Sequence, residues 1–334
     1  MDLMNLLGAV HGAVAQGVLW GIMTLGVYIT FRILDFPDLT VDGSFATGGA
    51  ISAILTESGM NPFLTLLFAT AGGMACGFIT GFLNTKMKIP GILAGILTMT
   101  ALYSINLRVM HDRANVPLLG VDTVDMQVGQ WVPMLSRYNS QLLLGGVIAI
   151  AMIFFLYWFF GTELGSAIRA TGNNPQMVRS LGVNTDTMVI LALVLSNGLV
   201  GLSGALVAQV QGFGDVSMGI GTIVIGLASV IIGEVLLGRI MGFLPRLAAM
   251  IAGSVLYRII IAVVLFYGLK SQDMKLLSSV VVAMALFMPT MNRMFQDYMV
   301  RRAANSPNRM VPDQELEDAI DDSDKDPDEP NQQG

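Results

Sequence analysis

Apolar residues in this chain occur in long runs, and short segments between the runs hold most of the charged residues. About 20 consecutive apolar residues form a helix long enough to cross the ~30 Å hydrocarbon core of a bilayer. The pattern therefore predicts an all-α polytopic membrane protein with about nine membrane-spanning segments. We expect these segments near residues 12–31, 44–57, 62–84, 91–110, 141–160, 187–210, 219–237, 243–267 and 276–290.

Basic residues set the expected orientation, because cytoplasmic loops of membrane proteins carry an excess of Lys and Arg. If the polar run 161–186 is cytoplasmic, basic residues favour that side about two to one. The N-terminus (1–11) is then extracytoplasmic, and residues 111–140 form the longest external loop. The basic residues placed inside are Arg32, Lys86, Lys88, Arg169, Arg179, Arg239, Arg246, Arg293, Arg301 and Arg302, and those outside are Arg108, Arg113, Arg137, Lys270 and Lys275.

Composition agrees with the membrane class, since 54% of the 334 residues are hydrophobic and only 13% are charged. The net charge of −6 comes from the C-terminus, where residues 311–334 hold ten acids and one lysine. We expect residues 291–334 to be a disordered cytoplasmic tail, either a solvated extension or a regulatory segment.

Catalytic patterns are missing from the sequence. A single cysteine, Cys76, and two distant histidines, His11 and His111, give no metal-site spacing. The sequence offers no nucleophile with a base, and no GxxxxGK[ST] loop to cradle phosphates. We therefore expect no catalytic residue, no metal and no cofactor in this chain, and no ATP hydrolysis by the chain alone.

Two short segments resemble each other and interrupt the apolar pattern. Phe36–Ser44 (FPDLTVDGS) and Phe213–Gly221 (FGDVSMGIG) share the order Phe, spacer, Asp, branched aliphatic and hydroxyl residue. The expected topology places them toward opposite faces of the membrane. This arrangement is typical of inverted half-repeats, whose broken helices line a translocation pathway. We expect Asp38 and Asp215 to occupy equivalent breaks and to cap backbone amides there.

Other polar residues lie inside apolar runs and are costly in a membrane, so they should face protein or water. Glu234 is either a deep pathway residue or an anchor at the cytoplasmic helix end beside Arg239. Asn197 and Gln209 fit interhelical hydrogen bonds equally well. The candidate pathway residues are Asp38, Thr40, Asp42, Ser44, Asn197, Asp215, Ser217 and Glu234.

The polar run ATGNNPQMVRSLGV (170–183) predicts two short helices at the membrane surface. The first can end at Gly172, where a left-handed residue costs little, and the second can start at Pro175 with Asn173 or Asn174 as its N-cap. These two short helices would form a polar protrusion that carries arginine. Such a protrusion suits a protein interface that contains water.

This region resembles the cytoplasmic coupling segment of the permease subunits of bacterial ABC importers, the branched-chain amino acid and ribose permease family. The resemblance spans nearly all of residues 12–290, and its details are similar to a subgroup associated with tryptophan or tyrosine uptake. Val178 departs from the small residue common there, and the chain lacks one leading helix of the sugar permeases. The resemblance implies ATPase-coupling roles for Gly165, Arg169, Ala170, Gly172, Asn174, Pro175, Arg179 and Gly182.

What the resemblance implies is a non-catalytic transport subunit in the bacterial inner membrane. It would work as a homodimer with a cytoplasmic ABC ATPase dimer, which binds ATP and Mg, and with an extracytoplasmic substrate-binding protein. The solute would be an amino acid of the aromatic kind. The main alternative is a stand-alone secondary transporter that couples Asp38, Asp42 or Asp215 to protons or sodium.

Overall fold

The computed structural model describes residues 3–131, 137–237, 242–267, 276, 278–284, 287 and 291. The chain divides into two units, Met1–Leu286 and Phe287–Gly334. In the second unit only positions 287 and 291 are described, both of them helical. The predicted acidic tail lies outside the described residues, and the predicted span 276–290 lies partly outside them. The account below concerns the first unit.

Helices make up nearly all of the described chain, as a lipid environment requires of a backbone whose polar groups must pair internally. A π-helical turn, η1 (Ile29–Ile33), continues the first helix. The other elements are α1 (Leu3–Tyr28), α2 (Thr40–Glu57), α3 (Pro62–Thr85), α4 (Gly91–Val109), β1 (Asn115–Pro117), α5 (Val124–Trp131), α6 (Arg137–Gly161), α7 (Glu163–Asn173), α8 (Pro175–Ser180), α9 (Thr185–Gln211), β2 (Phe213–Asp215), α10 (Thr222–Leu237) and α11 (Phe243–Phe266).

Six of the described helices are long and apolar enough to cross a membrane, and the apolar run of α10 is shorter. The predicted count of nine segments is therefore not confirmed. The predicted segment 44–57 corresponds to α2, which has 18 residues and carries Asp42 and Glu57. The first helix begins at Leu3, earlier than predicted. The six spans are Gly8–Ile33, Pro62–Thr85, Gly91–Val109, Tyr138–Gly161, Thr185–Gln211 and Phe243–Phe266.

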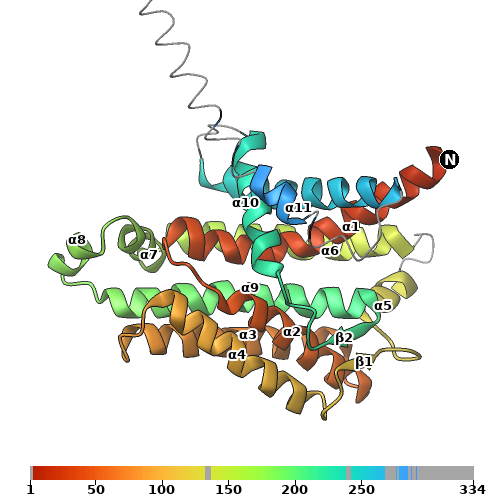
Figure 1. The fold of residues 1–334 in the computed structure, drawn as a ribbon, viewed down its shortest axis with the longest axis horizontal. Coiled ribbons are helices and arrows are strands. Elements are labelled where there is room, and N and C mark those ends of the chain that lie inside the picture. The colour runs from red at the N-terminus through yellow and green to blue at the C-terminus, as the bar shows by residue number, and fades with distance from the viewer. Residues whose placement is uncertain are drawn as a thin grey trace, which may run out of the picture. The chain divides into compact units, whose positions relative to one another are not determined.

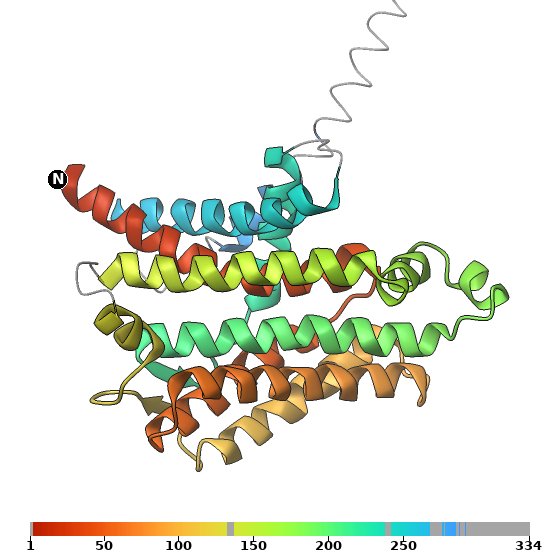
Figure 2. The same cartoon turned by 180° about the vertical axis from the view of Figure 1, so that it is seen from behind.

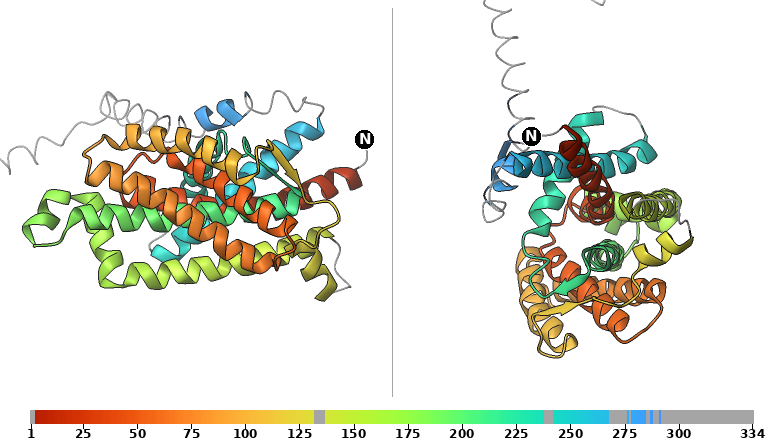
Figure 3. Two further views of the ribbon diagram at one scale, coloured as in Figure 1. Left: turned by 90° about the horizontal axis from the view of Figure 1, so that it is seen from below. Right: turned by 90° about the vertical axis from the view of Figure 1, so that its right-hand side faces the viewer.

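Helix α9 lies at the centre of the helical layers, with α1 and α6 on one side and α2 and α3 on the other (Figures 1 and 2). The end-on view in Figure 3 shows α9 enclosed by these neighbours. Gly73 and Gly77 of α3 pack against the backbone of α9, where an added Cβ would overlap carbonyl oxygens. Close approach through small residues is the main way helices pack in membranes.

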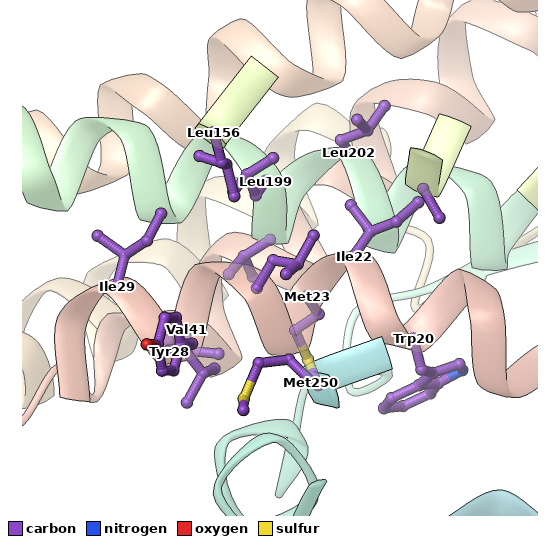
Figure 4. Close-up of a cluster of buried hydrophobic side chains, with 14 of the residues drawn as sticks. Trp20, Ile22, Met23, Tyr28, Ile29, Val41, Leu156, Leu199, Leu202 and Met250 are labelled. Carbon is purple, nitrogen blue, oxygen red and sulfur yellow. The ribbon is translucent and has the colours of Figure 1, made fainter. Parts of the chain in front are cut away.

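Large apolar side chains fill the space between these layers (Figure 4). Ile22 from α1 lies on the side facing Leu199 and Leu202 of α9. Leu156 from α6 lies beside Leu199, whereas Met23 points toward Met250 of α11. Hydroxyl groups bridge the same helices, since Ser203 on α9 donates to the Leu19 carbonyl of α1 at 2.8 Å. The core therefore fixes α1 and α9 side by side.

The two ends of this unit differ. Helices α7 and α8 extend at one end, and β1, β2 and α5 lie at the other (Figure 1). The strands are antiparallel, with Asn115 opposite Asp215, Val116 opposite Gly214 and Pro117 opposite Phe213. The region predicted as an external loop, 111–140, thus contains a strand and a helix. This pairing joins segments about 100 residues apart, which local sequence patterns do not reveal.

Candidate coupling segment and translocation pathway

Helices α7 and α8 each begin at a residue whose side chain caps the helix N-terminus. Thr162 caps α7 by accepting a hydrogen bond from the Gly165 amide at 3.3 Å. Asn174 caps α8 by accepting from the Met177 amide at 3.0 Å, and Pro175 occupies the first turn. Proline is favoured there because its missing N–H has no helical partner at that position. The predicted start of the second helix is confirmed, with Asn174 as the cap.

The predicted left-handed conformation at Gly172 is wrong. Gly172 lies inside α7, which continues to Asn173, and its φ angle is not positive. Its hydrogen side chain is needed for another reason, because an added Cβ would overlap the carbonyl oxygen of Ile33 at the end of η1. Gly172 therefore marks the place where the helix pair lies directly on the end of the first membrane helix. The left-handed glycine of the segment is Gly182, at φ 83°, just beyond α8.

Two further residues of the predicted coupling set fasten α7 to the membrane helices. Gly165 packs on the backbone of Phe159 and Phe160 in the last turn of α6. Arg169 donates to the Phe160 carbonyl at 2.8 Å, and its guanidinium carbon lies 5.6 Å from the centre of the Phe243 ring. Arg169 thus ties α7 to α6 and α11. Ala170 is half-buried in the same helix.

Two large apolar side chains of this segment are exposed. Met177 is 49% exposed and Leu181 is 72% exposed, while Val178 between them is buried. Met177 and Leu181 are not among the predicted coupling residues. Their spacing of four residues at the end of a predicted short helix is the signal that could have found them. Exposed apolar side chains with a polar surround are typical of a protein interface.

A polar network joins α8 to the connection between α3 and α4. Arg179 donates to the Thr185 hydroxyl at 2.6 Å and lies 3.4 Å from a carboxylate oxygen of Asp186. The other oxygen of Asp186 accepts from Lys88 at 3.2 Å. Beside this network is a polar cavity of about 490 Å³, lined also by Asp35 and Asn173. Asp186 is therefore shared between α8 and the hairpin that leads into α4.

Four predicted pathway residues form a buried network halfway along α9. Asn197 donates to Asp38 at 2.7 Å and accepts from Ser44 at 2.6 Å. Asp38 also accepts from the Thr40 amide at 2.9 Å, and the Thr40 hydroxyl contacts Thr80 at 2.7 Å. All four residues are at most 3% exposed. Their side chains satisfy one another across α2, α3 and α9, as polar groups in a membrane interior must.

Asp42 has a different role, because it serves the N-terminus of another helix. Its carboxylate accepts from the amides of Gly221 and Ile223, each at 2.8 Å, and from the Thr222 hydroxyl at 2.9 Å. Asp42 also lies in the first turn of α2. One negative charge therefore stabilises the positive ends of both α2 and α10. The close approach of the two segments requires Gly219, whose Cβ would overlap the Asp42 carbonyl.

Asp215 repeats the local geometry of Asp38. Each aspartate accepts from the amide two residues further on, Thr40 at 2.9 Å and Ser217 at 2.7 Å. Burial raises the pKa of Asp215, but hydrogen bonds from Ser217 and Asn115 outweigh it and hold the pKa below its ordinary value. Both predicted amide-capping roles are confirmed. A half-turn relating the two segments stays a prediction.

Glu234 forms an ion pair with Arg32 at the end of η1. Both side chains are partly exposed, 34% for Glu234 and 46% for Arg32. The geometry agrees with the anchoring interpretation of Glu234, with Arg32 as its partner. The predicted neighbour Arg239 lies outside the described residues.

Arg258 of α11, a half-buried residue, has an aromatic partner. The guanidinium carbon of Arg258 lies 3.8 Å from the centre of the Trp20 ring on α1. Such stacking stabilises a charge that is removed from water. The Nε of Arg258 has no hydrogen-bond partner among the contacts of the described chain.

Comparison with known proteins places these features in one family. The model of the branched-chain amino acid transport system permease component matches residues 10–290. The tyrosine transport system permease protein of Clostridioides difficile (strain R20291) is 39% identical over 280 residues, which cover 83% of this chain and 90% of that protein. An uncharacterized protein of Rickettsia prowazekii (strain Madrid E) is 33% identical over 279 residues, which cover 82% and 95%.

Among solved structures, an inward-facing ABC transporter described as of metal-chelate type matches with a TM-score of 0.45 and 17% identity, covering 86% of this chain and 85% of that one. The family model spans most of the chain, and the relatives exceed 30% identity over most of its length. The chain is therefore a multi-pass membrane protein that belongs to the family of branched-chain amino acid transport system permease components, a family of ABC transporter permeases.

Proposed function

We propose that this chain is the membrane-spanning subunit of an ATP-driven importer for an amino acid of the aromatic kind. Two copies form the pathway, a cytoplasmic ATPase dimer supplies the energy, and an extracytoplasmic binding protein delivers the solute. The tyrosine permease named above, at 39% identity over most of both chains, supports the substrate class. The subunit lies in the bacterial inner membrane with its N-terminus outside and its C-terminus in the cytoplasm.

The observation that carries this proposal is the way α7 and α8 are held. Gly165, Gly172 and Arg169 fix the pair to the ends of α6, η1 and α11, while Met177 and Leu181 stay exposed. The helix pair is therefore packed firmly against the membrane helices and keeps apolar side chains exposed. This arrangement suits a segment that docks on a partner and transmits its movement. We assign ATPase coupling to this segment, residues 161–186, including Ala170, Asn174, Pro175, Arg179 and Gly182.

The buried acids fit this function better than ion coupling. The oxygens of Asp38 and Asp42 accept hydrogen bonds from backbone amides and neighbouring side chains at 2.7–2.9 Å. A carboxylate that caps helix ends in this way is committed to structure and is a poor carrier of protons or sodium. We therefore favour the ATP-driven importer over the secondary transporter.

The test changes the exposed residues Met177 and Leu181 and leaves Gly165, Arg169 and Gly172 unchanged. The double variant Met177→Asp/Leu181→Asp is purified with its ATPase and compared with the unmutated protein by co-elution and by uptake into vesicles. We expect at least tenfold weaker co-elution and loss of uptake, because charge replaces the apolar centre of the interface. Leu119→Asp is the control for co-elution, since Leu119 is 88% exposed and lies two residues after β1. Strand β1 lies at the end of the unit opposite to α7 and α8 (Figure 1). Undiminished co-elution and uptake in the double variant contradict the proposal.

A further inference from the structure

A cavity of about 280 Å³ lies between α2, α4 and the turn that precedes α10. Its volume is close to the lower end of the range for small-molecule sites, roughly 300–1,000 Å³. The cavity adjoins the place where the N-termini of α2 and α10 meet at Asp42. Broken helices that meet in this way line the solute sites of other transporters. Its walls include Asp42, Ala46, Met99, Thr100, Tyr103, Asn106, Val216 and Ile220.

The feature that needs explanation is Asn106 in the wall of this cavity. Asn106 is 1% exposed, and neither its amide nitrogen nor its amide oxygen has a hydrogen-bond partner. An amide can donate two hydrogen bonds and accept two, so a buried amide with none is unusual in a native protein. Leaving such a group unpaired costs about 1–3 kcal/mol. A ligand with a hydrogen-bonding group would satisfy it.

The rest of the wall defines what that ligand can be. Met99, Val216 and Ile220 are apolar, and the Tyr103 ring is half exposed. The Thr100 hydroxyl already donates to the Ile96 carbonyl at 2.8 Å. Both oxygens of Asp42 accept from the start of α10. Among the described side chains of the wall, Asn106 is thus the buried one whose polar atoms have no hydrogen-bond partner.

We propose that this cavity is a contact site for the solute on its way through the permease, with Asn106 as the residue that determines specificity. It takes a flat apolar ring that carries a single hydrogen-bonding group, such as a phenol hydroxyl or an indole N–H. The Met99 thioether and the Tyr103 ring contact the faces of the ring, as sulfur and aromatic groups favourably do. A sugar needs many polar partners, so it fits this wall poorly. The proposal rests on the proposed function, amino acid import.

The test compares L-tyrosine with L-phenylalanine, which differ by one hydroxyl group. Vesicles contain the permease with its ATPase, and saturating binding protein loaded with either amino acid is added. For each variant, the uptake rate relative to the unmutated permease is measured for both amino acids. The relative rate for tyrosine is then divided by that for phenylalanine. This ratio does not depend on the selectivity of the binding protein, because that selectivity is the same for every permease variant. Asn106→Leu removes the amide at similar size, and Asn106→Ser keeps a hydrogen-bonding group.

We expect Asn106→Leu to lower the tyrosine-to-phenylalanine ratio about tenfold, because a site built to bind a hydroxyl discriminates strongly when its partner is lost. Asn106→Ser should restore part of the ratio. The melting temperature of Asn106→Leu should not fall, since an unpaired buried amide is replaced by an apolar group. The control is Ser104→Leu, which lies on the exposed side of α4 and should leave the ratio unchanged.

The outcomes separate the two claims. A ratio within twofold of the unmutated value, or an equal loss for both amino acids, overturns the assignment of Asn106 and leaves the import function standing. If the unmutated complex imports neither amino acid although its ATPase is active, the proposed function and this inference both fail.

Discussion

The carboxylate of Asp42 accepts a hydrogen bond from the backbone amide of Ile223 at 2.8 Å, although the two residues are 181 positions apart. Through this contact one acid joins the starts of α2 and α10. The two helix N-termini have partial positive charge, so the acid stabilises both. The arrangement gives the amides of Gly221 and Ile223 partners at the place where the two helices begin.

Removing that carboxylate should destabilise the protein. We expect Asp42→Ala to lower the free energy of unfolding by about 1–2 kcal/mol, the usual cost of losing a helix cap. Thermal unfolding of the purified protein measures the change. Asp122→Ala is the control, because Asp122 is exposed. Equal melting temperatures for the two variants contradict the capping role.

Gly172 should tolerate no side chain. In Gly172→Ala the new methyl group overlaps the Ile33 carbonyl, so α7 must move away from η1. We expect uptake to fall at least tenfold while the protein still inserts into the membrane. Gly161→Ala is a matched control, since an added Cβ at Gly161 meets no atom within 4 Å. Normal uptake by Gly172→Ala shows that this packing is not needed for coupling.

Asp186 should matter more for coupling than for stability. Its partners Lys88 and Arg179 are 70% and 62% exposed, and exposed ion pairs contribute only about 0–1 kcal/mol. We expect Asp186→Asn to change the melting temperature little and to lower the amount of solute imported per ATP hydrolysed. Both rates are measured on the same vesicles. An unchanged ratio argues against a link between α8 and α4 through this residue.

Gln209 should be essential for stability. Its amide nitrogen donates to Ser52 at 2.9 Å and Thr65 at 2.8 Å, and its oxygen accepts from the Val124 amide at 2.9 Å. Gln209→Leu leaves the Val124 amide without its partner and removes the hydrogen bonds to Ser52 and Thr65, and an unpaired buried group costs about 1–3 kcal/mol. We expect a large fall in melting temperature, whereas Gln211→Leu, at an exposed site two residues on, should change it little. Similar effects from the two substitutions contradict the prediction.

Orientation can be tested with single cysteines in a Cys76→Ala background. Asn115 lies in β1 and Gln176 in α8, and both are exposed at opposite ends of the first unit. An impermeant thiol reagent added to intact cells should label Asn115→Cys and spare Gln176→Cys. The reverse result places the N-terminus in the cytoplasm and overturns the proposed topology.

Local features of this protein follow from the sequence. The apolar runs predict where the long helices lie, because a lipid-exposed backbone must form its hydrogen bonds within a helix. Asn174 and Pro175 predict the start of α8, because a helix cap involves only three or four neighbouring residues. The helix pair α7 and α8 follows from such local residue types.

The tertiary structure alone decided which distant groups meet. Three contacts form only when α1, α2 and α9 have packed. They are the contact of Asp42 with Ile223, that of Gly172 with Ile33, and the pairing of β1 with β2. Asn106 is an ordinary helical residue in the sequence, and only its burial beside a cavity reveals an unpaired amide. Helix periodicity says which face of a helix is apolar, but several neighbours can cover that face. The choice among them depends on close packing of small residues between particular helices, which no local pattern encodes.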